Sequence, residues 1–262
     1  MSLRGRSHRR QRGLSLIELM ITMTLSSFLI IGATQIYLDN KSSYLFFKGQ
    51  TQNQDSGRYI LDRLQSRLDK AGYRRLPSTR MSAAFPAASS NGCSFAAGQA
   101  LVRVDDSTLC LRYQPRDASD RTCAGSSLSA VTGVATPYAL FDPSNNVVEK
   151  ITVANNVLTC NGTTLAENVM GIRFDYGIDD TSDESARKVS RYATAPASGK
   201  IVRSLRFAVL LASEQTNVSG GMAGGACSNW TALAGSSGTC SDSSGALHRI
   251  ATGSVALRNL MP

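Results

Sequence analysis

One apolar run near the N-terminus constrains this chain more than any other feature. From Leu14 to Leu38 there are 25 residues, and Glu18 is the only charged one among them. A helix needs ~20 mostly apolar residues to cross a membrane. The scattered Ser and Thr do not disqualify the run, because a hydroxyl can return its hydrogen bond to the helix backbone. The sequence therefore predicts a transmembrane helix over 14–38.

The charges that flank the run predict its orientation. Five arginines and no acid precede it, namely Arg4, Arg6, Arg9, Arg10 and Arg12, and the other flank carries Asp39 and Lys41. Positive residues stay on the cytoplasmic side. We expect a single-pass membrane protein with a cytoplasmic N-terminus and a C-terminal part on the opposite side of the membrane.

Glu18 needs an explanation. An ionisable group at mid-membrane costs ~2.5 to 3.5 kcal/mol on insertion scales and less near the interface, so a carboxylate kept there usually has a partner or a task. The alternative is that Glu18 reaches the interface and is solvated there.

The segment Arg12-Gly13-Leu14-Ser15-Leu16-Ile17-Glu18-Leu19-Met20 resembles the class III signal of type IV prepilins. The resemblance implies a leader over 1–13, cleavage between Gly13 and Leu14 by the prepilin peptidase, and N-methylation of Leu14. It also implies that Glu18 offsets the terminal ammonium of a neighbouring subunit. Leu14 departs from the family, which most often has Phe there. An ordinary secretory signal cleaved near Ala33 is the alternative, but its apolar region is typically ~7 to 15 residues and rarely carries an acid.

A second helical pattern follows the membrane segment. Ile60, Leu61, Leu64, Leu68 and Ala71 recur at spacings of three and four, which predicts one apolar stripe on a stalk helix over 39–72. Gly72 is expected to end the helix in the left-handed conformation. An unbroken helix over 14–71 would span roughly 87 Å at ~1.5 Å per residue. Gly49 and Gly57 disfavour a helix interior, so a bend is expected near either.

Three segments narrow the resemblance to PilW-type minor pilins. The segment 53–62, continued by 68–73, is similar to the stalk of that family; 167–179 is similar to its central strand and 255–259 to its closing strand. The resemblance implies a structural subunit that is built into a type IV pilus, at or near its tip. The implied partners are other minor pilins, the major pilin, the prepilin peptidase and the inner-membrane assembly machinery.

Residues 73–262 form a β-rich head. Two hairpins are predicted, the first pairing 99–104 with 108–113 and the second pairing 147–153 with 157–160. Further strands are expected at 171–178, 201–211 and 250–257, and the first of these alternates apolar and polar residues. The fold class is therefore α+β, with a long N-terminal transmembrane and stalk helix packed on an antiparallel β-sheet head.

All six cysteines fall in the head: Cys93, Cys110, Cys123, Cys160, Cys227 and Cys240. An even number fits disulfides in an oxidising compartment, and zinc is disfavoured because no two cysteines have the CxxC spacing. Sequence leaves fifteen connectivities for six cysteines open. Cys227 with Cys240 is the one favoured pair, because it would hold the Gly- and Ser-rich segment 219–245, which is expected to be a loop.

No enzyme is expected, and no cofactor. The chain has two histidines, His8 in the leader and His248 before a strand, and no nucleophile, zinc-protease or nucleotide-binding motif accompanies them. The acidic cluster Asp179, Asp180, Asp183 and Glu184 offers oxygen ligands for Ca²⁺, but it lacks the periodicity of an EF-hand and is better explained as a solvated turn.

The formal charge of +9 suggests nucleic acid, but loss of the five leader arginines lowers it to +4. The remaining basic residues are Arg74, Arg75 and Arg80 after the stalk, and Arg187, Lys188, Arg191, Lys200, Arg203 and Arg206 around one strand. Only Tyr192 is interleaved for stacking, so nucleic acid is not the expected partner. Two alternatives to the minor pilin remain: a minor pseudopilin of type II secretion, and a membrane-anchored adhesive or DNA-binding module.

Overall fold

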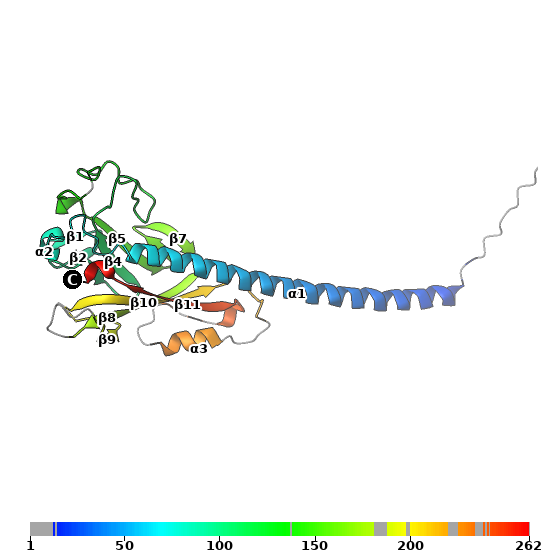
Figure 1. The fold of residues 1–262 in the computed structure, drawn as a ribbon. Coiled ribbons are helices and arrows are strands. Elements are labelled where there is room, and N and C mark those ends of the chain that lie inside the picture. The colour runs from blue at the N-terminus through cyan, green and yellow to red at the C-terminus, as the bar shows by residue number, and fades with distance from the viewer. Residues whose placement is uncertain are drawn as a thin grey trace, which may run out of the picture. The chain divides into compact units, whose positions relative to one another are not determined.

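The longest element is helix α1, which spans Leu16–Leu68 (Figure 1). The computed structural model describes residues 13, 15–136, 138–180, 188–197, 200–219, 225–233, 238, 240 and 242–261. The chain divides into two units, Met1–Leu45 and Phe46–Pro262. The second unit therefore contains the C-terminal part of α1 together with all the strands.

The buried stripe of α1 begins earlier than the sequence pattern predicts. Its buried residues are Gly49, Asn53, Gly57, Ile60, Leu64 and Leu68, at spacings of three and four. The predicted stripe is thus confirmed, and two glycines and an asparagine extend it. α1 continues through Gly49 and Gly57, where the sequence predicted a bend. A Cβ on Gly49 would lie only 3.2 Å from the Cβ of Ser213, so this glycine permits close packing.

α1 ends at Leu68, three residues before the predicted end. The backbone takes 3-10 geometry there, because the N–H groups of Lys70 and Ala71 donate to the carbonyls three residues earlier. Gly72 has a φ of +72°, as the left-handed prediction requires. Its N–H donates to the carbonyl of Arg112 at 2.9 Å, which ties the end of the helix to a strand.

The strands of the head form three antiparallel sheets. A two-stranded sheet pairs β1 (Ala88–Ser90) with β2 (Cys93–Phe95). A five-stranded sheet has the order β3-β4-β5-β6-β7, formed by Leu101–Arg103, Thr108–Tyr113, Val147–Ala154, Val157–Cys160 and Thr163–Glu167. A four-stranded sheet has the order β11-β10-β8-β9, formed by His248–Ala256, Ile201–Ala212, Val169–Asp179 and Arg191–Ala193.

These sheets confirm the α+β fold class and both predicted hairpins, β3–β4 and β5–β6. The strands predicted at 171–178, 201–211 and 250–257 correspond to β8, β10 and β11. The sequence pattern missed β1, β2, β7 and β9, of which only β7 exceeds three residues. It also missed the short helix α2 (Met81–Ala84) and the 3-10 turns at Pro143–Asn145, Asp242–Ser244 and Arg258–Leu260.

One core joins the helix to both larger sheets. Ile60, Leu64 and Leu68 of α1 belong to the same buried cluster as Leu109 and Ile151 of the five-stranded sheet. From the four-stranded sheet, the cluster takes in Ile172, Phe174, Tyr176, Ile178, Leu205, Phe207 and Val209. The alternating residues predicted for β8 thus point into the core, while Arg173 and Asp175 are half-buried.

The segment 219–245 corrects a prediction, because part of it is helical. Helix α3 (Gly225–Ala232) lies on the far side of β10 and β11 from α1 (Figure 1). Its Trp230 is fully buried and packs with Ala208 and Leu210 of β10. Tertiary burial of this one large side chain outweighs the poor helix propensity of a Gly- and Ser-rich segment.

Candidate functional site

The first candidate site is the N-terminal part of α1. Gly13 and Ser15 are exposed, and Leu14 lies outside the described residues. Glu18 is in the first turn of α1 and is exposed. No hydrogen bond or ion pair joins Glu18 to another described residue. A carboxylate in the first turn of a helix is favoured by the helix dipole, and here it remains open to a partner from another molecule.

The apolar segment around Glu18 is suited to a membrane. One helix in the described part of the chain is long and apolar enough to span it, and the most apolar stretch of that helix is wholly exposed. Five hydroxyls return their hydrogen bonds to the helix carbonyls, as expected: those of Thr22, Thr24, Ser26, Ser27 and Thr34. In lipid every polar group must be satisfied internally, and these groups are.

The six cysteines form three disulfides: Cys93–Cys110, Cys123–Cys160 and Cys227–Cys240. The first joins β2 to β4, the second joins the segment after β4 to β6, and the third joins α3 to the segment before β11. The pair favoured from the sequence is the third. Its bridge holds α3, and with it Trp230, against the outer face of β10.

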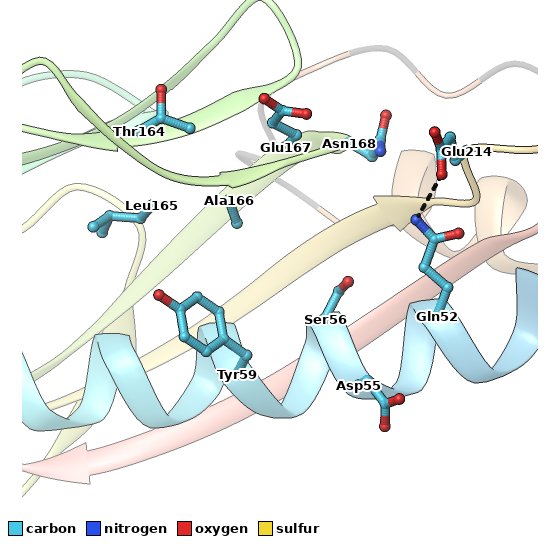
Figure 2. Close-up of a pocket in the computed structure, with 10 residues that line it drawn as sticks. All are labelled: Gln52, Asp55, Ser56, Tyr59, Thr164, Leu165, Ala166, Glu167, Asn168 and Glu214. Carbon is cyan, nitrogen blue, oxygen red and sulfur yellow. Dashed lines mark hydrogen bonds between the residues drawn. The ribbon is translucent and has the colours of Figure 1, made fainter.

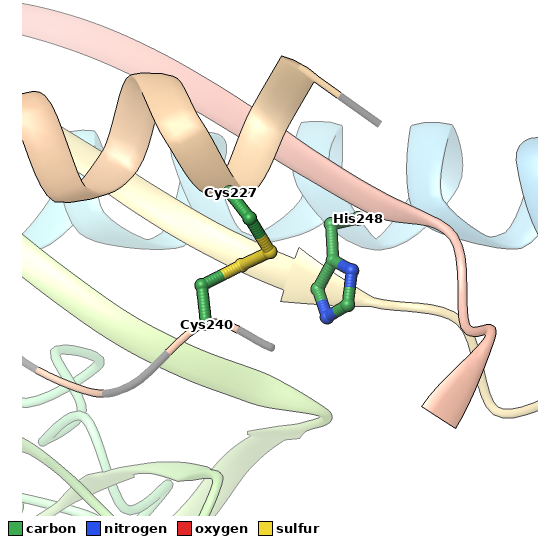
Figure 3. Close-up of side chains that lie close together, drawn as sticks. All are labelled: Cys227, Cys240 and His248. Atoms are coloured by element: carbon green, nitrogen blue, oxygen red, sulfur yellow. A yellow bond between two sulfur atoms is a disulfide. The ribbon is translucent and has the colours of Figure 1, made fainter. Parts of the chain in front are cut away.

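His248 lies at the start of β11, beside the Cys227–Cys240 disulfide (Figure 3). The ligand atoms of the three side chains lie within 4.8 Å of one another. Metal binding needs thiolates, and these sulfurs are bonded to each other. Glu149 forms a second cluster of this kind with Cys123 and Cys160, whose sulfurs are also bonded to each other. Neither cluster is a metal site while its disulfide is formed.

Two carboxylates of the predicted acidic cluster, Asp179 and Asp180, form ion pairs with basic residues. Asp179 is buried at the end of β8, 3.6 Å from a guanidinium nitrogen of Arg203. Asp180 pairs with Arg191 at 2.5 Å and with Lys200 at 3.0 Å, and these hydrogen bonds lower the pKa of the Asp180 carboxyl. Asp183 and Glu184 lie outside the described residues. The two described carboxylates are thus already neutralised by cations of the head.

Two of the basic residues noted in the sequence are buried rather than on the surface. Arg203 is buried and donates to the carbonyl of Leu260 at 2.8 Å. Arg75 is also buried and donates to carbonyls of the segment 115–136, including that of Val134 at 3.0 Å. Arg206 is exposed, and its guanidinium carbon lies 3.6 Å from the centre of the Tyr192 ring. Arg187 lies outside the described residues.

A groove that sequence reasoning missed lies between α1 and β7 (Figure 2). It is an open groove of about 770 Å³. Its wall on the helix is formed by Gln52, Asp55, Ser56 and Tyr59, and its other wall by residues 164–168 and Glu214. Gln52 donates to the Glu214 carboxylate at 3.4 Å. The sequence did place these four residues on one face of the helix, since they recur at spacings of three and four. The groove was nevertheless missed, because the opposite strand, β7, was not predicted.

Three carboxylates line this groove: Asp55, Glu167 and Glu214. All three are exposed, and none forms an ion pair with another described residue. The described lining includes no lysine or arginine. The groove is therefore an anionic surface on a chain whose formal net charge is +9.

Comparison with known proteins identifies the N-terminal segment. A family model described as the prokaryotic N-terminal methylation motif matches residues 8–34. This range includes Gly13, Leu14 and Glu18 and extends into the exposed apolar part of α1. No curated protein and no solved structure matches the chain. The motif supports a type IV pilin-like protein, and together with the apolar helix it fits a membrane-anchored one.

Proposed function

We propose that this type IV pilin-like chain is a structural minor pilin of the PilW type. It is made as an inner-membrane precursor, cleaved after Gly13 by the prepilin peptidase and methylated on Leu14. It then enters a type IV pilus through its N-terminal helix and primes assembly with other minor pilins and the major pilin at or near the tip. The observation that carries the proposal is the methylation motif over 8–34, which leads directly into an exposed apolar helix.

The physical reason for this design is the similarity of two environments. An exposed apolar helix can move from the bilayer to a fibre core of like helices with little change in hydrophobic free energy. Glu18 then supplies alignment, because a buried carboxylate satisfied only by a neighbour's terminal ammonium penalises a misplaced subunit.

The head supports the same proposal. Three disulfides suit a periplasmic and then extracellular location. Of the segments that resemble PilW-type proteins, 53–62 lies on α1, and 167–179 runs into β8 inside the four-stranded sheet. The segment 255–259 includes the last two residues of β11 and the start of the 3-10 turn Arg258–Leu260. Processing would leave His248 as the one histidine of the chain, and no nucleophile, zinc-protease or nucleotide-binding motif accompanies it, which supports a structural role.

The mass of the N-terminal peptide of the mature protein tests the proposal. We expect a chain that begins at methylated Leu14 when the protein is expressed with a prepilin peptidase. The uncleaved precursor from a strain without the peptidase is the control. A mature chain that begins near Ala33 would instead indicate an ordinary secretory signal.

A type II secretion pseudopilin is a second candidate, because the N-terminal methylation motif fits it equally. Deletion of the gene separates the two. Loss of surface pili and twitching with normal protein secretion supports the pilus. Loss of secretion with normal pili supports the pseudopilin.

A further inference from the structure

The groove between α1 and β7 runs along an unpaired strand edge. Among the described strands, β7 pairs only with β6 and is the last strand of its sheet. Outside that ladder, no backbone hydrogen bond joins residues 163–167 to another described residue. An edge of this kind presents unpaired N–H and C=O groups and can accept another strand.

The opposite wall leaves room for such a strand and offers contacts to it. Tyr59 is 44 % exposed and lies across the groove from Leu165 and Ala166, which are half-buried (Figure 2). The amide nitrogen of the Gln52 side chain donates to the Glu214 carboxylate at 3.4 Å, which holds these two side chains together at one end of the groove.

The charge of the groove selects the ligand. Asp55 stands on the helix, Glu167 at the end of β7 and Glu214 after β10, so carboxylates lie on both walls. A strand whose side chains were acidic would be repelled, and a strand with lysine or arginine would neutralise all three.

We propose that this groove binds an extended segment bearing lysine or arginine from another protein, which adds to β7 as a further strand of the five-stranded sheet. The main-chain ladder supplies the affinity, and the three carboxylates select the basic side chains. The binding site lies wholly within the unit Phe46–Pro262, and so it does not depend on cleavage after Gly13 or on assembly through Glu18.

Peptide binding to the full-length chain in neutral detergent tests the proposal. The probe is a labelled peptide of about seven residues that alternates lysine with threonine, long enough to lie along a strand of this length. We expect saturable binding by fluorescence anisotropy that weakens as salt is raised. The same peptide with alternate backbone nitrogens methylated should bind at least about tenfold more weakly, because it cannot complete the ladder.

Variants of the protein complete the test. The double variant Glu167→Gln with Glu214→Gln should weaken binding of the lysine peptide several-fold, whereas Asp69→Asn, an exposed acid at the end of α1, should leave binding unchanged. Absence of saturable binding, equal binding of the methylated peptide, or equal binding by the double variant would each overturn the proposal. The proposal would also be overturned if the peptide did not bind and the chain instead associated with itself in a way that the double variant abolished. That result would assign the groove to a second copy of the chain.

Discussion

Two carboxylates of this chain occupy opposite surroundings. Glu18 is exposed on an apolar helix and has no partner among the described residues. Glu149 is fully buried in the head, where one oxygen accepts hydrogen bonds from the Tyr113 hydroxyl at 2.9 Å and the Cys123 N–H at 2.7 Å. Glu18 awaits a contact from another molecule, while one oxygen of Glu149 has its contacts supplied by its own fold and the other is buried without a hydrogen-bond donor among the described residues.

Replacing Glu18 tests its role in alignment. We expect Glu18→Ala to leave the protein cleaved and membrane-bound, because the helix becomes more apolar. Its incorporation into sheared pili should fall sharply, because the carboxylate that would pair with a neighbouring terminus is gone. Immunoblots of pilus and membrane fractions measure both. Thr34→Val, which removes a hydroxyl already bonded within the helix, is the control. Normal incorporation of Glu18→Ala would contradict this role.

The buried carboxyl of Glu149 predicts a pH effect on stability. Burial raises the pKa of Glu149 above 4.5, although Arg67 lies 3.6 Å away and opposes the shift. A raised pKa in the folded state means that folding favours the protonated carboxyl. The free energy of unfolding of the wild type, relative to Glu149→Gln, should therefore rise as the pH falls from about 7 towards the unfolded pKa, and then level off.

Urea denaturation of both proteins at several pH values measures this difference, and the Gln variant serves as the control for other titrating groups. A difference that decreases on acidification would mean that the ion pair with Arg67 outweighs burial.

At the scale of elements, the contact of α1 with the four-stranded sheet depends on small residues. A Cβ on Gly57 would lie 3.4 Å from Ala251 and from Leu211, at the limit of ordinary van der Waals contact. Glycine therefore leaves space for a methyl group and no more. The two sides of this interface approach each other more closely than larger side chains would permit.

Two substitutions at Gly57 should have opposite effects. Gly57→Ala should raise the free energy of unfolding by up to about 1 kcal/mol, because alanine favours the helix and fits the space. Gly57→Leu should lower it by about 1 to 3 kcal/mol, because the larger side chain overpacks the interface. Urea denaturation of the full chain in detergent measures both. Equal stability of the two variants would show that the helix moves away from the sheet at no cost.

At the scale of the whole molecule, the head neutralises or buries much of its positive charge. Arg75 and Arg203 are buried, and Arg191 and Lys200 pair with Asp180. The leader carries five more arginines that processing would remove. Net charge therefore overstates the basic surface that a nucleic acid would meet.

We expect the mature chain not to retard duplex DNA in an electrophoretic assay at about 150 mM salt, because loss of the five leader arginines lowers its formal net charge from +9 to +4. The uncleaved precursor is the control and should bind more strongly at low salt through its leader arginines. A retarded band of the mature chain that weakens steeply with salt would favour the DNA-binding alternative.

Local patterns predicted those elements whose periodicity is strong. The stripe of Ile60, Leu64 and Leu68 and the alternation in β8 follow from spacing, because burial of one face imposes a period. Both hairpins follow from the turn residues between two short runs. The pattern failed at α3, where Trp230 is buried by packing on β10 rather than by any periodic neighbours. It also failed at β7, a largely polar strand whose position depends on its pairing with β6.

The sequence by itself determined the anchor, since 25 residues with one charge need no tertiary context to prefer an apolar environment, and the methylation motif is read directly from adjacent residues. Tertiary structure alone decided how the other four cysteines pair, which arginines are buried and where α1 meets β7. Those features join residues far apart in the chain, and their proximity depends on how strands pair and helices pack, which local periodicity does not specify.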